Sequence, residues 1–308
     1  MQKITPHLWF DKEAKEAATF YAGVFPDSKI NQVSVIKDTP SGDCDIVSFQ
    51  VWGQQFMSIS AGPLFKFNPS ISFIVNFDPL FFKGSASPAK EARQKMDAVW
   101  ESLSEGGIVL MPLDKYPFSE RYGWIQDKYG VTWQLILTEP QGHPRPPIVP
   151  SIMFVGENAG RAEEAIKFYL DVFKDSKMGE AHRYGSNQQP DTEGTLMYAD
   201  FRIEGCWLAA MDSAQEHKFN FNEAISLLIN CDTQKEIDYY WNKLSADPKA
   251  EQCGWLKDKF GLSWQVNPSS MDEMLNDKDP ARVKRVTEAF LKMKKFDLAT
   301  LEKAYQGA

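Results

Sequence analysis

The sequence predicts an α+β protein made of two tandem copies of one domain, followed by C-terminal helices. Three observations predict this class: a twelve-residue motif that occurs twice, a βαβββ order of strand and helix patterns within each copy, and a proline-rich stretch between the copies. Each copy is expected to hold two such βαβββ modules.

The repeated motif is the clearest sign of duplication. Residues 123–134 read Gly-Trp-Ile-Gln-Asp-Lys-Tyr-Gly-Val-Thr-Trp-Gln, and residues 254–265 read Gly-Trp-Leu-Lys-Asp-Lys-Phe-Gly-Leu-Ser-Trp-Gln, with seven of twelve positions identical. Segments 20–29 and 67–72 return in the same order at 168–177 and 221–226. Two copies in register indicate a duplicated domain rather than a short-repeat solenoid.

The boundary between the copies lies in a segment where five prolines occur within residues 138–150. Proline is excluded from helix interiors and central strands and favours a stiff, extended linker. We therefore expect domain 1 at 1–140, a linker at 141–147, domain 2 at 148–268 and a helical tail at 269–308.

The first module is predicted from residues 4–61. A short strand at 4–10 precedes a helix whose apolar residues recur at helical spacing from Ala14 to Phe25, and Pro26 ends that helix. Strand patterns follow near 29–37, 45–52 and 55–61, the last two joined by a hairpin at Gly53.

The second module begins with a strand at 70–77. Ser87-Pro88 is typical of a helix start, and strands are expected near 107–111, 122–127 and 131–137. Gly130 stands where the last hairpin needs a left-handed residue. The inserted segment Asp78–Ser87 carries Phe81 and Phe82, which could cover a pocket mouth or pack between domains.

Domain 2 repeats this order with a shorter second module, because few residues separate the helix ending near Ser245 from Gly254. After Pro268 the pattern is helical to the end of the chain, and we expect these helices to pack back on the sheets.

Composition excludes several functions. The chain has 308 residues, a net charge of −8 and no dense Lys/Arg stripe, which argues against nucleic acid or anionic membrane as a partner. The sequence shows no signal peptide and no apolar run long enough to span a membrane. The four cysteines form no CxxC pair, so we expect a cytoplasmic protein with reduced thiols.

Several segments resemble the PhnB-like family of the glyoxalase/bleomycin-resistance/dioxygenase (vicinal oxygen chelate) superfamily. They are Pro6–Phe10, Ala17–Tyr21, the repeated Gly-Trp-x-x-Asp-Lys-x-Gly-x-x-Trp-Gln motif and the tail from Arg282 to Ala304. The resemblance implies tandem glyoxalase-like domains, each with paired βαβββ modules whose mixed sheets curl into a cup. In active superfamily members, the first and last strands of the modules supply His, Gln and Glu ligands to a divalent metal.

This family is often labelled 3-demethylubiquinone-9 3-methyltransferase. Cofactor-dependent methyltransferases usually place a glycine-rich loop after the first strand of a doubly wound parallel sheet. The sequence has neither that loop nor that alternation, so methyl transfer is not expected.

Strand alternation predicts which side chains face the cup of domain 1. We expect a ligand-binding set at His7, Trp9, Phe56, Ser58, Ser60, Ser72 and Gln134. His7 is the best candidate for a catalytic residue, with a strand histidine satisfied by a neighbour as the alternative. The tryptophans of the two repeated motifs, Trp124, Trp133, Trp255 and Trp264, are expected in the core, and Asp127 and Asp258 at turn starts.

His7 and Gln134 match the superfamily's ligand positions, but the other corners offer only serines. Such a set is a poor metal site, so no cofactor is expected, with a divalent metal on His7 and Gln134 as the alternative. In domain 2, Ser151, Ala210 and Gln265 give a cup that is expected to be structural.

Three functions remain open. The first is metal-independent binding of a small molecule in the domain 1 cup; the others are a lyase, isomerase or dioxygenase using His7, and a structural or interaction protein with filled cups. The tandem arrangement is compatible with a monomer containing an internal pseudo-dimer, or with a homodimer.

Overall fold

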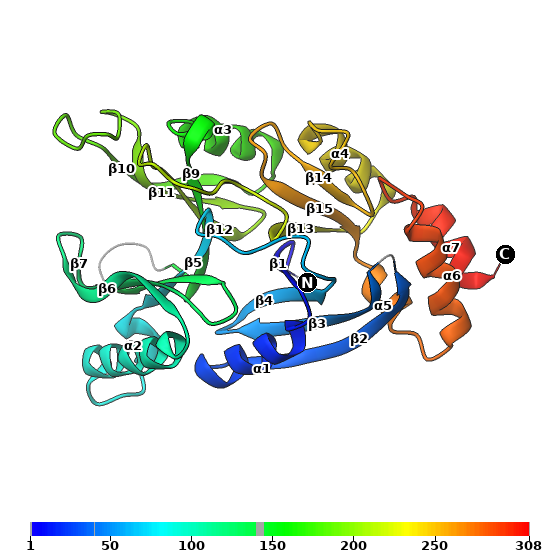
Figure 1. Ribbon diagram of the computed structural model, residues 1–308, viewed down its shortest axis with the longest axis horizontal. Coiled ribbons are helices and arrows are strands. Elements are labelled where there is room, and N and C mark those ends of the chain that lie inside the picture. The colour runs from blue at the N-terminus through cyan, green and yellow to red at the C-terminus, as the bar shows by residue number, and fades with distance from the viewer. Residues whose placement is uncertain (1, 40, 140–144, 308) are drawn as a thin grey trace.

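The computed structural model describes residues 2–39, 41–139 and 145–307, which form four successive modules and a helical tail (Figure 1). The proposed linker therefore lies largely outside the described residues, apart from Arg145, Pro146 and Pro147. Domain boundaries within the chain stay a prediction.

The first two modules follow the predicted order. Module 1 consists of β1 (Ile4–Phe10), α1 (Ala14–Val24), β2 (Lys29–Thr39), β3 (Gly42–Val51) and β4 (Gln54–Ser60). Module 2 consists of β5 (Ile71–Phe77), η1 (Pro79–Phe82), α2 (Pro88–Ser104), β6 (Ile108–Tyr116), β7 (Ser119–Gln126) and β8 (Thr132–Leu137). Helix α2 begins at Pro88, and Gly130 has a φ of 94°, both as the sequence predicts.

The third and fourth modules repeat this order with one strand fewer at the end. Module 3 consists of β9 (Ile148–Phe154), η2 (Gly156–Asn158), α3 (Ala162–Val172), β10 (Lys177–Arg183), β11 (Leu196–Ile203) and β12 (Cys206–Asp212). Module 4 consists of β13 (Ile225–Cys231), α4 (Gln234–Leu244), β14 (Trp255–Lys257) and β15 (Ser263–Pro268). The described part of module 4 thus lacks a counterpart of β6.

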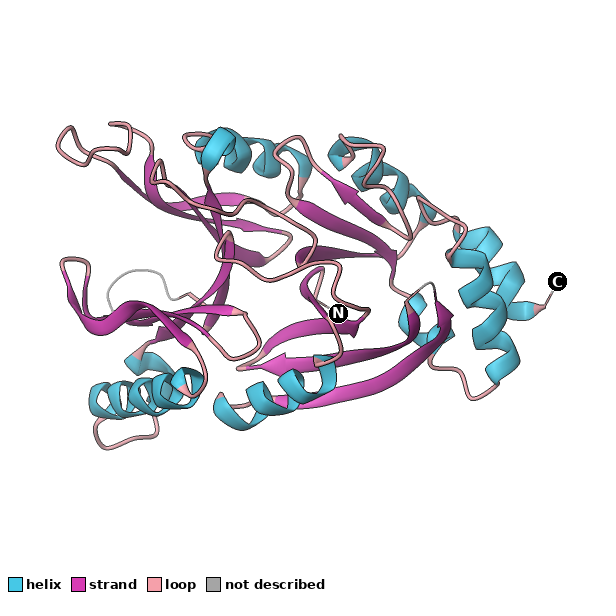
Figure 2. Cartoon of the chain, in the orientation of Figure 1, coloured by secondary structure: helices cyan, strands magenta, loops and turns pink. Residues whose placement is uncertain are grey.

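The strands of the described residues form two mixed, open sheets (Figure 2). The β1 sheet has the order β14-β15-β13-β1-β4-β3-β2, and the β5 sheet has the order β10-β11-β12-β9-β5-β8-β7-β6. In Figure 1, α1 and α2 lie along one side of the molecule and α3 and α4 along the opposite side. The α+β class and the tandem repeat are confirmed.

The sheets combine modules from different copies, which corrects our assignment of each cup to one copy. Strand β1 of module 1 pairs antiparallel with β13 of module 4, and β5 of module 2 pairs antiparallel with β9 of module 3. Each sheet therefore has one face that meets helices and one face that belongs to a cup shared by both copies.

The two modules of one copy instead pack through their helix-covered faces. Phe56 of β4 meets Phe73 of β5 with ring centroids 5.0 Å apart, and Tyr21 of α1 meets Trp133 of β8 at 5.2 Å. These side chains are fully buried, so apolar burial holds the modules of a copy together although they share no sheet.

A buried carboxylate supports the contact between Tyr21 and Trp133. Asp127 accepts hydrogen bonds from the Tyr21 hydroxyl at 2.8 Å, from Trp133 Nε1 at 2.8 Å, and from the backbone N–H groups of Tyr129 and Val131. Burial raises the pKa of Asp127, and these four hydrogen bonds partly offset the shift. The turn role predicted for Asp127 is confirmed, and the carboxylate also ties α1 to the last hairpin of module 2.

Domain 2 reproduces this arrangement. Asp258 accepts from the Tyr169 hydroxyl at 2.7 Å, from Trp264 Nε1 at 2.9 Å, and from the backbone N–H groups of Phe260 and Leu262. Trp133 and Trp264 are fully buried core residues, as expected.

The sequence leaves two roles open for Phe81 and Phe82, which are to cover a pocket mouth or to pack between domains. Phe81 and Phe82, in η1 of module 2, pack on Trp52 of module 1, with ring centroids 5.8 and 6.1 Å from that of Trp52. They do not line the large cavity described below, so the lid interpretation is wrong.

The tail helices do pack back on the protein, as expected. They are α5 (Met271–Leu275), α6 (Pro280–Phe290) and α7 (Leu298–Gln306), with buried side chains at Met271, Val286, Phe290 and Leu301. In Figure 1, α6 and α7 lie at the right-hand end of the molecule, and α6 contacts β2 of the β1 sheet.

Candidate functional site

A cavity of about 480 Å³ lies on the cup face of the β1 sheet. Its walls come from module 1, module 4 and the tail, and most of its lining is aliphatic or aromatic. This volume is within the range of small-molecule pockets, which are mainly apolar with a few placed polar groups.

Strand alternation explains which residues reach the cavity. His7 and Trp9 project from β1, and their parallel register partners on β4 are Met57 and Ile59. Because side chains alternate between faces, Leu8 points to the opposite face and is buried in the helix-side core.

Aromatic rings build the wall around His7. Trp255 of β14 meets the His7 ring edge-on at 5.4 Å and the Trp9 ring at 5.9 Å. Trp9 also meets Phe65 at 5.1 Å, and its indole Nε1 donates to the Gly62 carbonyl at 2.9 Å. The Trp9 ring is therefore held in one orientation at the cavity wall.

The tail supplies the remaining apolar wall. Met271 and Leu275 of α5 line the cavity, together with Phe290, Leu291 and Phe296. The tail is therefore part of the site and not only a cover for the sheet.

His7 is the chemically distinctive residue of this cavity. Its side chain is 5% exposed, and its Nδ1 atom has no hydrogen-bond partner among the described residues. Burial lowers the pKa of His7 from its usual 6.5 to about 3. The imidazole is therefore neutral at physiological pH, and the alternative of a neighbour satisfying His7 Nδ1 is not observed.

Next to His7 lies a glutamine–serine pair. Ser226 of β13 is the register partner of His7, and Gln265 Nε2 of β15 donates to Ser226 Oγ at 2.9 Å. The β5 sheet repeats the pair, since Gln134 Nε2 donates to Ser72 Oγ at 2.7 Å, and Ser72 is the register partner of Ser151. Ser151 thus takes the place that His7 has in the β1 sheet.

The predicted site is therefore split between two cups. His7 and Trp9 line the cavity, whereas Ser72 and Gln134 lie in the β5 sheet, so these four residues form no common site. The glutamine that accompanies His7 is Gln265, which the sequence analysis assigned to a structural cup.

The prediction for β4 is also wrong. Phe56 and Ser58 are buried on the helix side, and Ser60 Oγ accepts a hydrogen bond from the backbone N–H of Ala14 at 3.2 Å. Sequence reasoning assumed that the polar face of β4 lines the cup. Met57 and Ile59, which alternate with the two serines along β4, line the mainly apolar cavity instead. The alternation is visible in the sequence, but it does not tell which of the two faces meets the cavity.

Sequence reasoning also missed Trp255, which it placed in the core. The repeat alone could not single out Trp255, because Trp124 occupies the same place in the other motif and is also only half-buried, whereas Trp133 and Trp264 lie in the core.

The donors around His7 do not fit a divalent metal. The neighbouring groups are the Ser226 hydroxyl, the Gln265 amide and the Met57 thioether, with no carboxylate among them. Within residues 2–39, 41–139 and 145–307, no group of three or more His, Cys, Asp or Glu side chains could hold a metal ion.

Charged side chains reach only the edge of the cavity. Glu223 pairs with Lys257 at 2.9 Å, and Lys249 and Asp272 are exposed. A charged ligand would therefore find no unpaired, buried counter-charge among the described lining residues, which favours an uncharged one.

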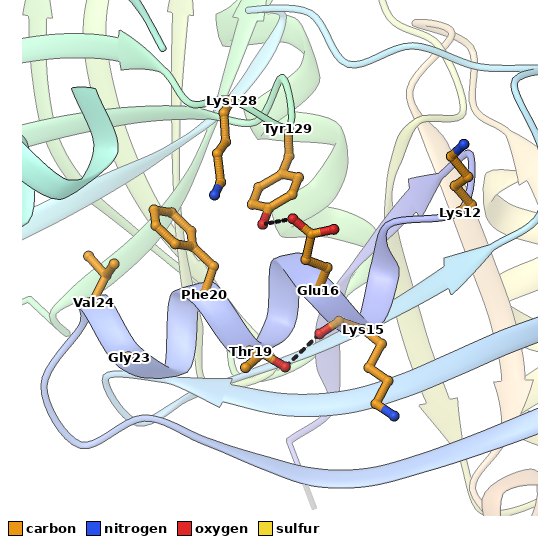
Figure 3. A pocket seen from close by; sticks show the side chains of 9 residues that line it. All are labelled: Lys12, Lys15, Glu16, Thr19, Phe20, Gly23, Val24, Lys128 and Tyr129. Atoms are coloured by element: carbon orange, nitrogen blue, oxygen red, sulfur yellow. Dashed lines mark hydrogen bonds between the residues drawn. The ribbon is translucent and has the colours of Figure 1, made fainter. Parts of the chain in front are cut away.

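A second hollow, of about 710 Å³, lies on the surface between α1 and the β7–β8 hairpin (Figure 3). Two contacts join residues of its lining: the Tyr129 hydroxyl donates to Glu16 at 2.8 Å, and Lys128 Nζ lies 4.8 Å from the centre of the Phe20 ring. Most of its lining is exposed, and we assign it no ligand.

No helix of the described residues is long and apolar enough to cross a membrane. None of the curated proteins matches the chain.

Two solved structures illustrate the similarity. The PhnB protein from Bacillus cereus is 34% identical over 44% of this chain and 100% of its own, with a TM-score of 0.38. Glyoxalase I from Zea mays is 12% identical over 89% of this chain and 97% of its own, with a TM-score of 0.51. The second likeness shows a shared fold.

The family model described as 3-demethylubiquinone-9 3-methyltransferase matches residues 2–136 and 146–267. The two matches coincide with the two copies of the repeat and together cover most of the chain. The chain therefore belongs to this family, which is the PhnB-like family that its motifs resemble.

Proposed function

We propose that the protein binds an uncharged, largely apolar small molecule in the cavity of the β1 sheet, without a tightly held metal. The observation that carries this proposal is the mainly apolar cavity of about 480 Å³, with a neutral His7 in its wall whose Nδ1 has no hydrogen-bond partner among the described residues. A ligand would bury apolar surface against Trp9, Trp255 and the tail, and polar contacts to His7 or Gln265 would orient it.

Catalysis receives less support from the same residues. A general base works best when its pKa lies near the working pH, and the pKa of His7 is about 3. A metal-dependent reaction on His7 and Gln134 has no basis, because these residues lie in different sheets. The sheets are mixed rather than doubly wound and parallel, so methyl transfer is not proposed despite the family's label.

Two further features belong to this proposal. The two copies complete each other's sheets within one chain, which supports a monomer with an internal pseudo-dimer. The four cysteines are free, in keeping with a cytoplasmic protein.

The test is a fluorescence titration with N-phenyl-1-naphthylamine, an uncharged apolar probe. Saturable binding is expected in the wild type. Ser34 of β2 lines the cavity, and Ser34→Trp should fill it and weaken binding about tenfold or more. A wild type that does not bind this or any other uncharged aromatic probe would count against the proposal.

The neighbouring residue provides a matched control. Val35 is 43% exposed on the other face of β2, and Val35→Trp should bind like the wild type. Equal losses in both variants would show that the probe does not occupy this cavity.

A further inference from the structure

The cup face of the β5 sheet contains an arginine that comes from outside the sheet. Arg145 precedes β9, and its Nε and Nη2 atoms lie 2.6 and 3.1 Å from the two carboxylate oxygens of Asp200 on β11. Its guanidinium carbon lies 3.9 Å from the centre of the Trp207 ring on β12. The side chains of Arg145 and Asp200 are 14% and 4% exposed, so this contact is largely withdrawn from solvent.

The sheet orients Asp200 independently of the arginine. The backbone N–H of Glu180 donates to Asp200 Oδ1 at 2.8 Å, and the Tyr198 hydroxyl lies 3.5 Å from Oδ2. Both donors belong to the β10–β11 hairpin. The carboxylate is thus held in place by its own sheet and presents its oxygens toward the cup.

Gly179 provides the space for this arrangement. A Cβ atom at Gly179 would lie 1.8 Å from Asp200 Oδ1 and 2.9 Å from the Trp207 ring. Any other residue at position 179 would have to displace both the Asp200 carboxylate and the Trp207 indole. The backbone of β10 therefore packs directly against these two groups.

The described residues of the β1 sheet contain no such pair at the equivalent positions. Phe49 stacks on Tyr21 as Phe201 stacks on Tyr169, which aligns β3 with β11. Ser48 and Gln55 then take the places of Asp200 and Trp207. The acid and the aromatic ring therefore distinguish the second cup from the cavity discussed above.

A carboxylate that accepts two parallel N–H groups, beside the face of an indole, is complementary to a planar guanidinium. We propose that the cup face of the β5 sheet is a binding site for an alkylguanidinium group, formed by Asp200 and Trp207, in which Arg145 is a tethered occupant that competes with free ligand. This site is independent of the proposed ligand of the β1 sheet. A primary alkylammonium lacks the planar fork and binds less well.

The experiment is calorimetric titration of full-length Arg145→Ala with propylguanidinium at constant ionic strength. We expect one saturable site in Arg145→Ala and binding weaker by about tenfold or more in the wild type, because the tethered side chain competes at a high effective concentration. Asp200→Asn in the Arg145→Ala background should abolish binding, and propylammonium should bind more weakly than propylguanidinium.

Arg121 gives a matched control, because its Nε also lies 2.6 Å from a carboxylate, that of Asp97, on a more exposed surface. Arg121→Ala should not gain a propylguanidinium site. If Arg145→Ala does not fold, Arg145→Gln retains part of the side chain without its charge or planar fork and should give the same result. Absence of saturable binding in a folded Arg145 variant, equal binding in Arg121→Ala, or binding that survives Asp200→Asn would overturn the proposal.

Discussion

His7 makes the stability of the protein depend on pH in a way that can be calculated. Its pKa is about 3 in the folded protein and about 6.5 in the unfolded chain. Because the folded-state pKa is lowered, the unfolded chain binds more protons between these values, and stability is lost as the pH falls below about 6.5.

The magnitude follows from linkage at 1.36 kcal/mol per pKa unit. At pH 7.5 both states are neutral at this position. A pH of 5 is about 1.5 units below the pKa of the unfolded histidine, which is then protonated, while the folded histidine is still neutral. The free energy of unfolding therefore falls by about 2 kcal/mol. This value barely changes for any folded-state pKa below about 4.

The assay is urea denaturation of the wild type and of His7→Leu at pH 7.5 and pH 5. The wild type should lose about 2 kcal/mol more than the variant between these pH values, since other titrating groups cancel in the comparison. His7→Leu should also be more stable at pH 5, because it removes a buried nitrogen with no partner among the described residues.

His182→Gln is the control, because the His182 side chain is 59% exposed. It should change the pH dependence little. If wild type and His7→Leu lose the same free energy between pH 7.5 and pH 5, His7 is not buried and neutral, and the description of the cavity wall is wrong.

Three other predictions concern the architecture. Asp127→Asn keeps the size of the side chain but removes acceptors for two buried donors, and should lower the free energy of unfolding by about 3 kcal/mol in urea denaturation; a loss below about 1 kcal/mol would contradict the role assigned to this carboxylate. Arg145→Ala leaves Asp200 buried without the guanidinium and should cost about 3 kcal/mol in the same assay, whereas a change near zero would mean that the pair is not desolvated. Residues 1–140 alone leave β1 and β5 without their antiparallel neighbours, so light scattering should find a dimer that pairs these strands between chains, and a stable monomer would contradict the cross-copy sheets.

Much of the fold could be predicted because it depends on local signals. The motif near residue 123 and its repeat near 254 fix the duplication, Pro88 marks the start of α2, and Gly130 marks a hairpin. Each of these features depends on a particular backbone conformation or periodicity, and a short stretch of sequence is enough to indicate it.

The composition of the cups could not be predicted in the same way. Gln134 and Gln265 occupy equivalent positions in the repeat, so the sequence does not say which one shares a sheet with His7. That choice depends on which modules pack through their helix-covered faces, and this depends on distant contacts such as Phe56 with Phe73.

Polarity also misled the choice of face on β4. Ser58 and Ser60 predict a polar cup, but these serines lie on the side of the sheet that faces α1. There Ser60 Oγ accepts a hydrogen bond from the backbone N–H of Ala14, the first residue of α1. An apolar ligand site has no polar signature in a strand, so nothing in the sequence separates Met57 and Ile59, which line the cavity, from core residues.

Photolabelling with benzophenone, an uncharged apolar molecule, tests most directly whether the first and last modules share one ligand cavity. After irradiation, peptide mapping by mass spectrometry should place the label on both sides of that cavity, at residues such as Met57 of β4 and Met271 of α5. Labelling at both places, reduced in Ser34→Trp and unchanged in Val35→Trp, is the predicted result. Labelling concentrated within residues 71–212, the two middle modules, would contradict the account.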